Sequence, residues 1–259
     1  MCGIIAAASN RNVGKLLVQG LHKMEYRGYD SAGIALHQTD QIAHLRTLGK
    51  VKLLEEKMIA EKPKSKLGIA HTRWATHGEP SEENAHPHMS NERVYIVHNG
   101  IIENHEEIRG FLRNEGYEIT SETDSELIAH LVHFYKKDTQ DTLQALMKAT
   151  HELNGAYSIA VVCKQEKGKV YAARQKSPLL VGLGIEENFV ASDPLAIVNI
   201  TERFHMLEDG DFAVVTREDV VIYDQEGAPV ERDELKLSLI HISEPTRQAE
   251  ISYAVFCLK

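Results

Sequence analysis

The first hundred residues alternate between strand-like and helical hydrophobic patterns. Residues 2–8 form a short apolar run typical of a buried strand, and residues 13–24 carry apolar side chains at helical spacing. Four further strands are predicted over residues 32–36, 42–48, 67–72 and 94–98. The last of these ends at Asn99-Gly100, a pair common in turns. The chain therefore begins with a strand and a helix and continues into sheet.

Helices cluster in the middle of the chain. Residues 105–115 follow a helical pattern closed by Gly116, and residues 124–137 follow Thr123-Asp124-Ser125-Glu126, which matches a capping box. A third helix is predicted over residues 142–153 and a short one at Asp193-Pro194. Later strands are predicted over residues 157–163, 170–173, 179–181, 212–215 and 220–223. Clustered helices and hairpin-length gaps between strands favour an α+β layered sandwich over a doubly wound parallel sheet.

Composition narrows the class of protein. The 259 residues are 42% hydrophobic and 26% charged, as in globular proteins, and the length leaves one large domain or two small ones open. A net charge of −9 argues against a nucleic-acid partner. No apolar run is long enough for a membrane span, and residues 1–7 lack a basic leader. Three cysteines without disulfide or metal spacing fit reduced thiols, so we expect a cytoplasmic protein.

Cys2 is the first candidate for chemistry. A small residue after the initiator Met1 permits removal of that methionine, which would leave a thiol and a free α-amine on one residue. The amine, with a pKa of about 7.7–8.0, is able to accept the thiol proton. Alternatively, Cys2 is a small hydrophobic residue at the start of a strand. Taken alone, Cys2 favours the structural interpretation.

A second candidate is the polar segment after the strand predicted over residues 67–72. Arg73 offers a planar fork for a carboxylate, Thr76 offers a hydroxyl, and Trp74 is able to cover a ligand. Equally, Arg73 could pair with a structural acid and Trp74 could fill the core. These two interpretations have similar weight.

Two further positions have structural and functional interpretations. Asn99 and Gly100 offer an amide and a backbone N–H that suit an oxyanion, although an ordinary Asn-Gly turn is favoured for the pair in isolation. Asp124 at a helix start is favoured by the helix dipole, and it could equally hold an ammonium group.

Cofactor motifs are not apparent. The 14 histidines include no His-Glu-x-x-His motif, and Gly182-Leu183-Gly184 lacks the third glycine of a dinucleotide loop. We therefore predict no metal and no other cofactor.

Taken jointly, the motifs resemble one family, the N-terminal-cysteine (class II) glutamine amidotransferases. Within it they are most similar to the glutaminase domain of glutamine:fructose-6-phosphate aminotransferases (isomerising), from Cys2 to about residue 235. The segments that carry the resemblance are residues 2–4, 25–33, 71–80, 98–104 and 121–124. The resemblance implies a four-layer αββα sandwich of the N-terminal nucleophile hydrolase type.

The resemblance also implies a role for each candidate residue. Cys2 would attack the side-chain amide of L-glutamine through a thioester, and Asn99 and Gly100 would hold the oxyanion. Arg73, assisted by Thr76 and His77, would bind the substrate α-carboxylate.

The remaining roles concern the ammonium group, the nucleophile's position and the closing loop. Asp124 would bind the α-ammonium group and Arg27 would help to position Cys2. Trp74 would belong to a loop that closes over the substrate.

In the family, ammonia passes to sugar-phosphate isomerase domains that convert fructose 6-phosphate to glucosamine 6-phosphate for hexosamine synthesis. We expect residues 2–236 to form the glutaminase domain, residues 237–259 to be a disordered or artefactual tail, and the isomerase domains to be absent. The family is dimeric largely through that missing half, so no dimer is expected here. The alternatives are a truncated, non-catalytic glutamine-binding module and the glutaminase domain of another class II amidotransferase.

Overall fold

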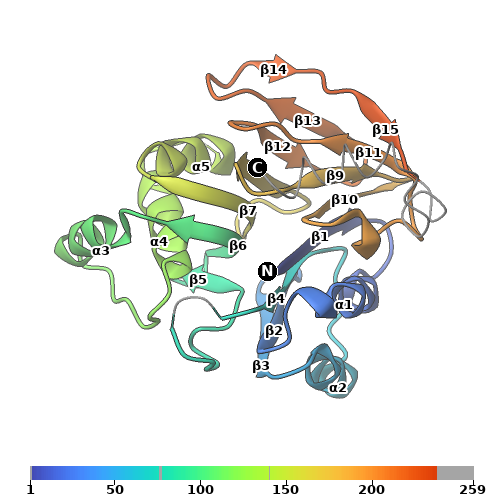
Figure 1. The fold of residues 1–259 in the computed structure, drawn as a ribbon, viewed down its shortest axis with the longest axis horizontal. Coiled ribbons are helices and arrows are strands. Elements are labelled where there is room, and N and C mark those ends of the chain that lie inside the picture. Colours follow the sequence, from blue (N-terminus) through green and yellow to red (C-terminus); the bar gives the residue numbers. More distant parts are fainter. Residues whose placement is uncertain (1, 76–77, 140, 238–259) are drawn as a thin grey trace.

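Two antiparallel β-sheets form the centre of the molecule (Figure 1). The computed structural model describes residues 2–75, 78–139 and 141–237. The first sheet has eight strands in the order β15-β11-β9-β10-β1-β4-β2-β3, and the second has seven in the order β14-β13-β12-β8-β7-β6-β5. Of the tail predicted over residues 237–259, all but residue 237 lies outside the described residues.

The strands and helices have the following bounds. The first sheet contains β1 (Gly3–Ser9), β2 (Ser31–His37), β3 (Ile42–Leu48), β4 (Leu67–Arg73), β9 (Leu180–Leu183), β10 (Glu187–Ala191), β11 (Arg203–Met206) and β15 (Glu234–Lys236). The second contains β5 (His88–Ser90), β6 (Val94–Ile102), β7 (Gly155–Cys163), β8 (Val170–Gln175), β12 (Phe212–Val215), β13 (Val220–Tyr223) and β14 (Pro229–Val230). The helices are α1 (Gly14–Lys23), α2 (Val51–Glu61), α3 (His105–Asn114), α4 (Ser125–Lys136) and α5 (Thr142–His151), with short 3₁₀ turns η1 (Glu25–Arg27) and η2 (Pro194–Ala196).

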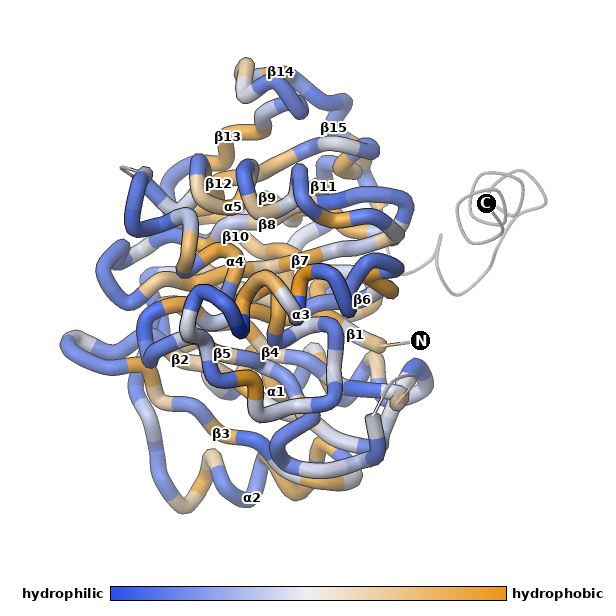
Figure 2. The backbone as a smooth tube through the Cα atoms, turned by 90° about the vertical axis from the view of Figure 1, so that its left-hand side faces the viewer, coloured by the Kyte–Doolittle hydropathy of each residue, from blue (hydrophilic) through white to orange (hydrophobic). Residues whose placement is uncertain are grey.

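Three hydrophobic clusters define four layers. One cluster joins α1 and α2 to the first sheet, a second joins α3, α4 and α5 to the other sheet, and the third lies between the sheets. Figure 2 shows the hydrophobic positions concentrated along the strands, with hydrophilic positions prominent in the peripheral loops. The predicted α+β, four-layer αββα sandwich is confirmed.

Side-chain alternation along β1 determines where its first residues point. Ile5 and Ala7 pack on the α1 side, whereas Ile4 and Ala6 pack between the two sheets. Because successive strand residues face opposite sides, Cys2 belongs to the inter-sheet side, beyond Ile4. The start of β1 therefore directs Cys2 toward the edge of the inter-sheet core.

The local predictions differ from the structure in several places, and strands β5, β10, β11, β14 and β15 were not predicted. Strand β6 does not end at Asn99-Gly100 but continues to Ile102, with Asn99 opposite Ser158 and Gly100 opposite Tyr157 on β7. Helix α2 was not predicted, since only Val51 and Leu54 of it are buried. The capping box forms by half: Thr123 Oγ1 accepts from the Glu126 N–H at 3.4 Å, but the Glu126 carboxylate bonds elsewhere.

No helix among the described residues is long and apolar enough to cross a membrane.

Candidate active site

Cys2 lies against the backbone of Trp74. The Trp74 N–H donates to Cys2 Sγ at 3.3 Å, and Sγ lies 3.5 Å from the Trp74 carbonyl oxygen. Burial raises the pKa of the Cys2 thiol, and the negative charge of Asp30 adds to that effect, while the Trp74 hydrogen bond and Arg73 oppose it. A thiol with a raised pKa is protonated at neutral pH, so a nucleophilic role for Cys2 requires a base.

Asn99 reaches Cys2 from the second sheet. Its Nδ2 donates to the Cys2 carbonyl oxygen at 3.1 Å. The next residue, Gly100, has φ +138°, and a Cβ there would lie 1.9 Å from the Ala156 carbonyl oxygen. Only glycine fits this position of β6, because strand pairing with β7 brings the two backbones together. The Asn99-Gly100 pair is thus a strand feature next to Cys2 and not a turn.

Arg73 ends β4 on the side that faces the second sheet. Its guanidinium donates to the carbonyl oxygens of Gly78 at 3.2 Å and Glu79 at 3.5 Å. Burial lowers the pKa of Arg73, opposed by the negative charges of Cys2, Asp30, Asp124 and Glu122 in its surroundings. Cys2 and Asp124 therefore lie close enough to Arg73 for their charges to affect its pKa.

The segment after Arg73 packs on the turn after α1. Gly28 approaches it so closely that a Cβ would lie 2.6 Å from the Arg73 carbonyl carbon. The Trp74 ring, 43% exposed, contacts Tyr29 edge to face with 5.5 Å between ring centroids. Thr76 and His77, both expected to bind substrate, lie outside the described residues.

Asp124 precedes α4 and is buried. Its Oδ2 accepts from the Ile102 N–H at 2.8 Å, and its Oδ1 accepts from Ser125 Oγ at 3.2 Å. Its side chain makes no helix-capping hydrogen bond. The purely helical explanation for Asp124 is therefore incomplete, because its carboxylate is turned toward β6, the strand that carries Asn99.

Arg27 makes its ion pair with a residue that sequence reasoning missed. Its Nη2 lies 2.8 Å from Asp193 Oδ2, and the Tyr26 hydroxyl donates to the same oxygen at 2.5 Å. The preceding residue, Ser192, accepts the Ile4 N–H on Oγ at 2.9 Å. Arg27 is thus tied to the segment that holds the start of β1, close to Cys2 in the chain.

Two other residues missed as site candidates are Asp30 and His71. Asp30 Oδ2 accepts from the Ala75 N–H at 2.7 Å, and His71 Nε2 lies 3.0 Å from Asn99 Oδ1. Asp30 belongs to the Arg27-Gly28-Tyr29-Asp30 turn, so the sequence shows its acidic side chain but gives no indication of its partner. No local pattern links His71 to Asn99.

The histidines gather without forming a metal site. The rings of His71 and His86 lie 4.0 Å apart, and those of His86 and His88 lie 4.6 Å apart. Among residues 2–75, 78–139 and 141–237, no three His, Cys, Asp or Glu side chains are placed to hold one metal ion. These rings lie in the protein interior: His71 bonds Asn99 and His88 bonds Thr123, whereas neither ring nitrogen of His86 has a hydrogen-bond partner among the described residues.

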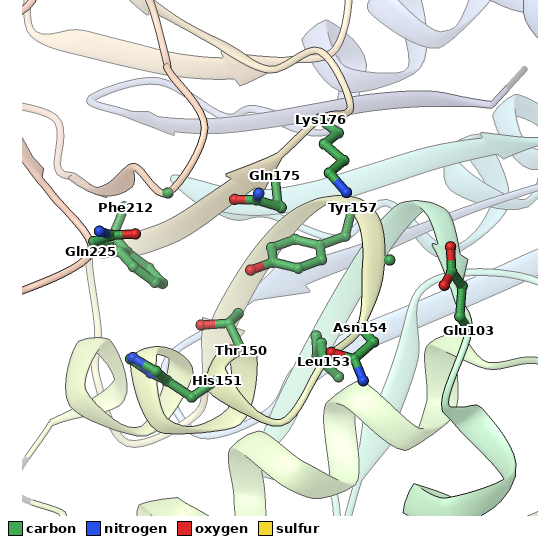
Figure 3. A pocket seen from close by; sticks show the side chains of 12 residues that line it. Glu103, Thr150, His151, Leu153, Asn154, Tyr157, Gln175, Lys176, Phe212 and Gln225 are labelled. Carbon is green, nitrogen blue, oxygen red and sulfur yellow. The ribbon is translucent and has the colours of Figure 1, made fainter.

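A cavity of about 530 Å³ opens beyond the β6–β7 pair and is separate from the Cys2 cluster. Figure 3 shows Tyr157 in its wall between Gln175 and Thr150. The described residues that line this cavity include Glu103 but neither Cys2 nor Asn99.

Comparison with known proteins places this geometry in a family. Residues 71–199 match the glutamine amidotransferase domain family. The chain is 49% identical over 242 residues to glutamine--fructose-6-phosphate aminotransferase [isomerizing] of Vibrio cholerae, covering 93% of this chain and 40% of that protein. It is 52% identical over 235 residues to the enzyme of the same name from Haemophilus influenzae, covering 90% and 38%. The chain thus spans about two fifths of the length of these curated relatives.

Solved structures show the same fold. The glutamine phosphoribosylpyrophosphate amidotransferase of B. subtilis matches with a TM-score of 0.75 at 22% identity, over 86% of this chain and 49% of that one. A glutamine aminotransferase class-II domain protein from Silicibacter pomeroyi matches with a TM-score of 0.60 at 16% identity, over 86% and 99%. The solved structures thus agree on the fold, while the family match and the curated relatives confirm the resemblance seen in the motifs: the chain belongs to the glutamine amidotransferase domain family, in the form carried by glutamine--fructose-6-phosphate aminotransferases.

Proposed function

We propose that this chain hydrolyses L-glutamine to glutamate and ammonia, with Cys2 as the nucleophile. The observation that carries the proposal is the meeting of Cys2 at the start of β1 with Asn99 from the other sheet, at 3.1 Å. An amide donor beside a thiol is the pairing that acyl transfer requires, since it stabilises the oxyanion formed on attack.

The reaction begins at the thiol. With Met1 removed, the Cys2 α-amine accepts the proton of Sγ, and Sγ forms a bond to the side-chain amide carbon of glutamine. The proton then passes to the leaving nitrogen, so the C–N bond breaks and ammonia departs. Water hydrolyses the γ-glutamyl thioester, releasing glutamate and restoring the thiol. The raised pKa of the Cys2 thiol is consistent with its need for the amine as a base.

The tetrahedral intermediate carries a negative oxygen. The Asn99 amide nitrogen has two N–H groups, one of which donates to the Cys2 carbonyl oxygen. In this proposal its other N–H and the Gly100 backbone N–H receive the oxyanion.

Opposite charges recognise the two ends of the free amino acid. Arg73 binds the substrate α-carboxylate, with Thr76 and His77 assisting, and Asp124 binds the α-ammonium group. The electrostatic proximity of Arg73 and Asp124 supports this assignment. A substrate with only one charged end would match only one of these two charges, which disfavours simple amides.

Trp74 and Arg27 act around the reacting groups. The Trp74 ring is partly exposed and its backbone contacts Cys2 Sγ, so movement of this segment would close the site over glutamine and exclude water. Arg27 positions Cys2 indirectly, through Asp193 and the Ser192 hydrogen bond to Ile4.

The names of the curated relatives point to an acceptor for the ammonia. The curated relatives are named for transfer to fructose 6-phosphate, and this chain spans 38–40% of them. We propose that the ammonia is destined for an isomerase partner that makes glucosamine 6-phosphate, in the cytoplasm, where thiols such as Cys2 and Cys163 stay free.

Glutamate release from L-glutamine tests the proposal, on protein whose intact mass shows that Met1 is absent. We expect turnover that Cys2→Ala abolishes. Cys163→Ala is the matched control, because Cys163 is the other described free cysteine and is buried in β7. Retained turnover in Cys2→Ala, or none in folded, Met-free protein, would contradict the proposal.

A further inference from the structure

The hydrogen bonds of Asn99 fix which way its amide faces. A carbonyl oxygen only accepts hydrogen bonds, so the atom 3.1 Å from the Cys2 carbonyl oxygen must be the amide nitrogen. The amide oxygen then faces His71, whose Nε2 lies 3.0 Å away. Because that oxygen can only accept, His71 must carry its proton on Nε2 and donate it.

The surroundings of His71 keep the ring in this donating form. His71 has no exposed surface. Burial lowers its pKa to about 3, and positive charge on His98 or Arg73 adds to that effect, opposed by the hydrogen bond to Asn99. The neighbouring His86 ring, whose own pKa is lowered, packs 4.0 Å away. The ring is therefore neutral across the pH range in which the enzyme would work.

We propose that His71 is a positioning residue that orients the Asn99 amide for oxyanion binding. Its Nε2–H holds the amide oxygen away from Cys2 and so points the amide NH₂ group toward the reacting carbon. If the amide were turned over, its oxygen would face the Cys2 carbonyl oxygen, and neither could donate a hydrogen bond to the other. The oxyanion would then also meet the amide oxygen, an acceptor, in place of an N–H donor. This inference rests on the proposed glutaminase function.

Three variants separate orientation of Asn99 from general stability. His71→Leu removes the donor, while His71→Gln returns an N–H at a similar distance along the side chain. His37→Leu is the matched control: His37 is also buried, and its Nε2 bonds the Lys164 carbonyl oxygen at 3.1 Å, at the end of β2 away from Arg73.

Steady-state glutaminase kinetics provide the first readout. We expect His71→Leu to lower kcat by about 10²-fold, the typical cost of a catalytic group displaced by about 1 Å. KM for glutamine should stay within about two-fold, because Asn99 acts on the transition state. His71→Gln should recover most of the lost kcat, and His37→Leu should keep the wild-type kcat. An unchanged kcat in His71→Leu, or equal losses in His71→Leu and His71→Gln, overturns the inference.

The second readout does not depend on turnover. Nitrogen-15 NMR of the histidine rings distinguishes the Nε2–H tautomer from the Nδ1–H tautomer. We expect His71 to show the Nε2–H form, assigned by its loss in His71→Gln. A Nδ1–H tautomer or a doubly protonated ring at neutral pH overturns the inference. If the wild-type chain shows this tautomer but hydrolyses no glutamine, the proposed function fails while the orientation of Asn99 by His71 stands.

Discussion

The Asp124 carboxylate accepts the backbone N–H of Ile102 at 2.8 Å and thereby fastens the start of α4 to the end of β6. Two groups with different proposed tasks, the Asp124 carboxylate and the Asn99 amide three residues before Ile102, are thus carried by one rigid unit. A change in the position of one would be transmitted to the other. Separate variants are needed to tell charge from position.

Asp124→Asn should weaken glutamine binding without displacing the strand. Asparagine keeps an oxygen for the Ile102 N–H but loses the charge for the substrate ammonium group. We expect KM to rise by about 10–100-fold, the loss of a charge-assisted hydrogen bond of about 1.5–3 kcal/mol. Asp141→Asn, at the N-cap of α5, is the control. Similar KM values for Asp124→Asn and the wild type would refute the assignment.

Asn99→Ala should lower kcat by about 10²–10³-fold with little change in KM, because an oxyanion donor acts mainly in the transition state. Initial rates over a range of glutamine concentrations give both constants. A rise in KM alone would show that Asn99 binds the substrate and not the oxyanion.

Extension of the chain before Cys2 should abolish turnover. A protein with Gly or Met joined to Cys2 has its α-nitrogen in an amide bond, which cannot accept the thiol proton at neutral pH. A cleavable leader that leaves either Cys2 or Gly-Cys2 provides the matched pair, compared by glutamate release and intact mass. Equal rates would exclude the α-amine as the base.

Asp30→Asn should make the Cys2 thiol more acidic. The Asp30 charge raises the pKa of this thiol, so its removal moves the pH midpoint of thiol alkylation downward. Asparagine retains an acceptor for the Ala75 N–H, which limits rearrangement. The control is the exposed Asp40→Asn variant, and mass spectrometry of Cys2 alkylation against pH gives the midpoint. An upward shift would contradict the assigned sign.

Glu126→Gln should destabilise the fold at neutral pH and less so in acid. Burial raises the pKa of Glu126, but hydrogen bonds from His130, Thr120 and Ser121 outweigh it and lower that pKa from 4.5. Because its carboxyl pKa is lowered, Glu126 stabilises the fold above pH 4.5. This contribution is lost as the pH falls toward the pKa that Glu126 has in the folded protein. We expect a loss of about 1–3 kcal/mol at pH 7 by denaturant unfolding. If the difference in free energy of unfolding between variant and wild type widened below pH 4.5, the predicted direction of the pH dependence would be wrong.

The sequence was most informative for short apolar runs bounded by turn residues. Residues 212–215 and 220–223 were predicted with the bounds that β12 and β13 have. Strand β6 was cut short, because Asn-Gly is a turn signal that pairing with β7 overrides. Helix α2 was missed because only two of its residues are buried, too few for a periodic signal.

For the candidate site, the sequence likewise indicated the residues in local motifs but not the long-range contacts between them. Cys2, Arg73, Asn99 and Asp124 belong to ordered motifs, and the motifs together pointed to one family. His71 and Asp193 were missed because their partners, Asn99 and Arg27, are distant in sequence and only the sheet topology brings them together. No local rule of spacing contains that information.

The neighbours of β1 determine when Cys2, the proposed nucleophile, can take its place in the fold. Strand β1 pairs on one side with β4 and on the other with β10, whose residues end at Ala191. Strand β1 therefore precedes both of its partner strands in the sequence, and it gains its second partner only after most of the described domain has been synthesised. The proposed nucleophile thus stays apart from its proposed oxyanion donor and substrate-binding charges until the surrounding sandwich closes around it.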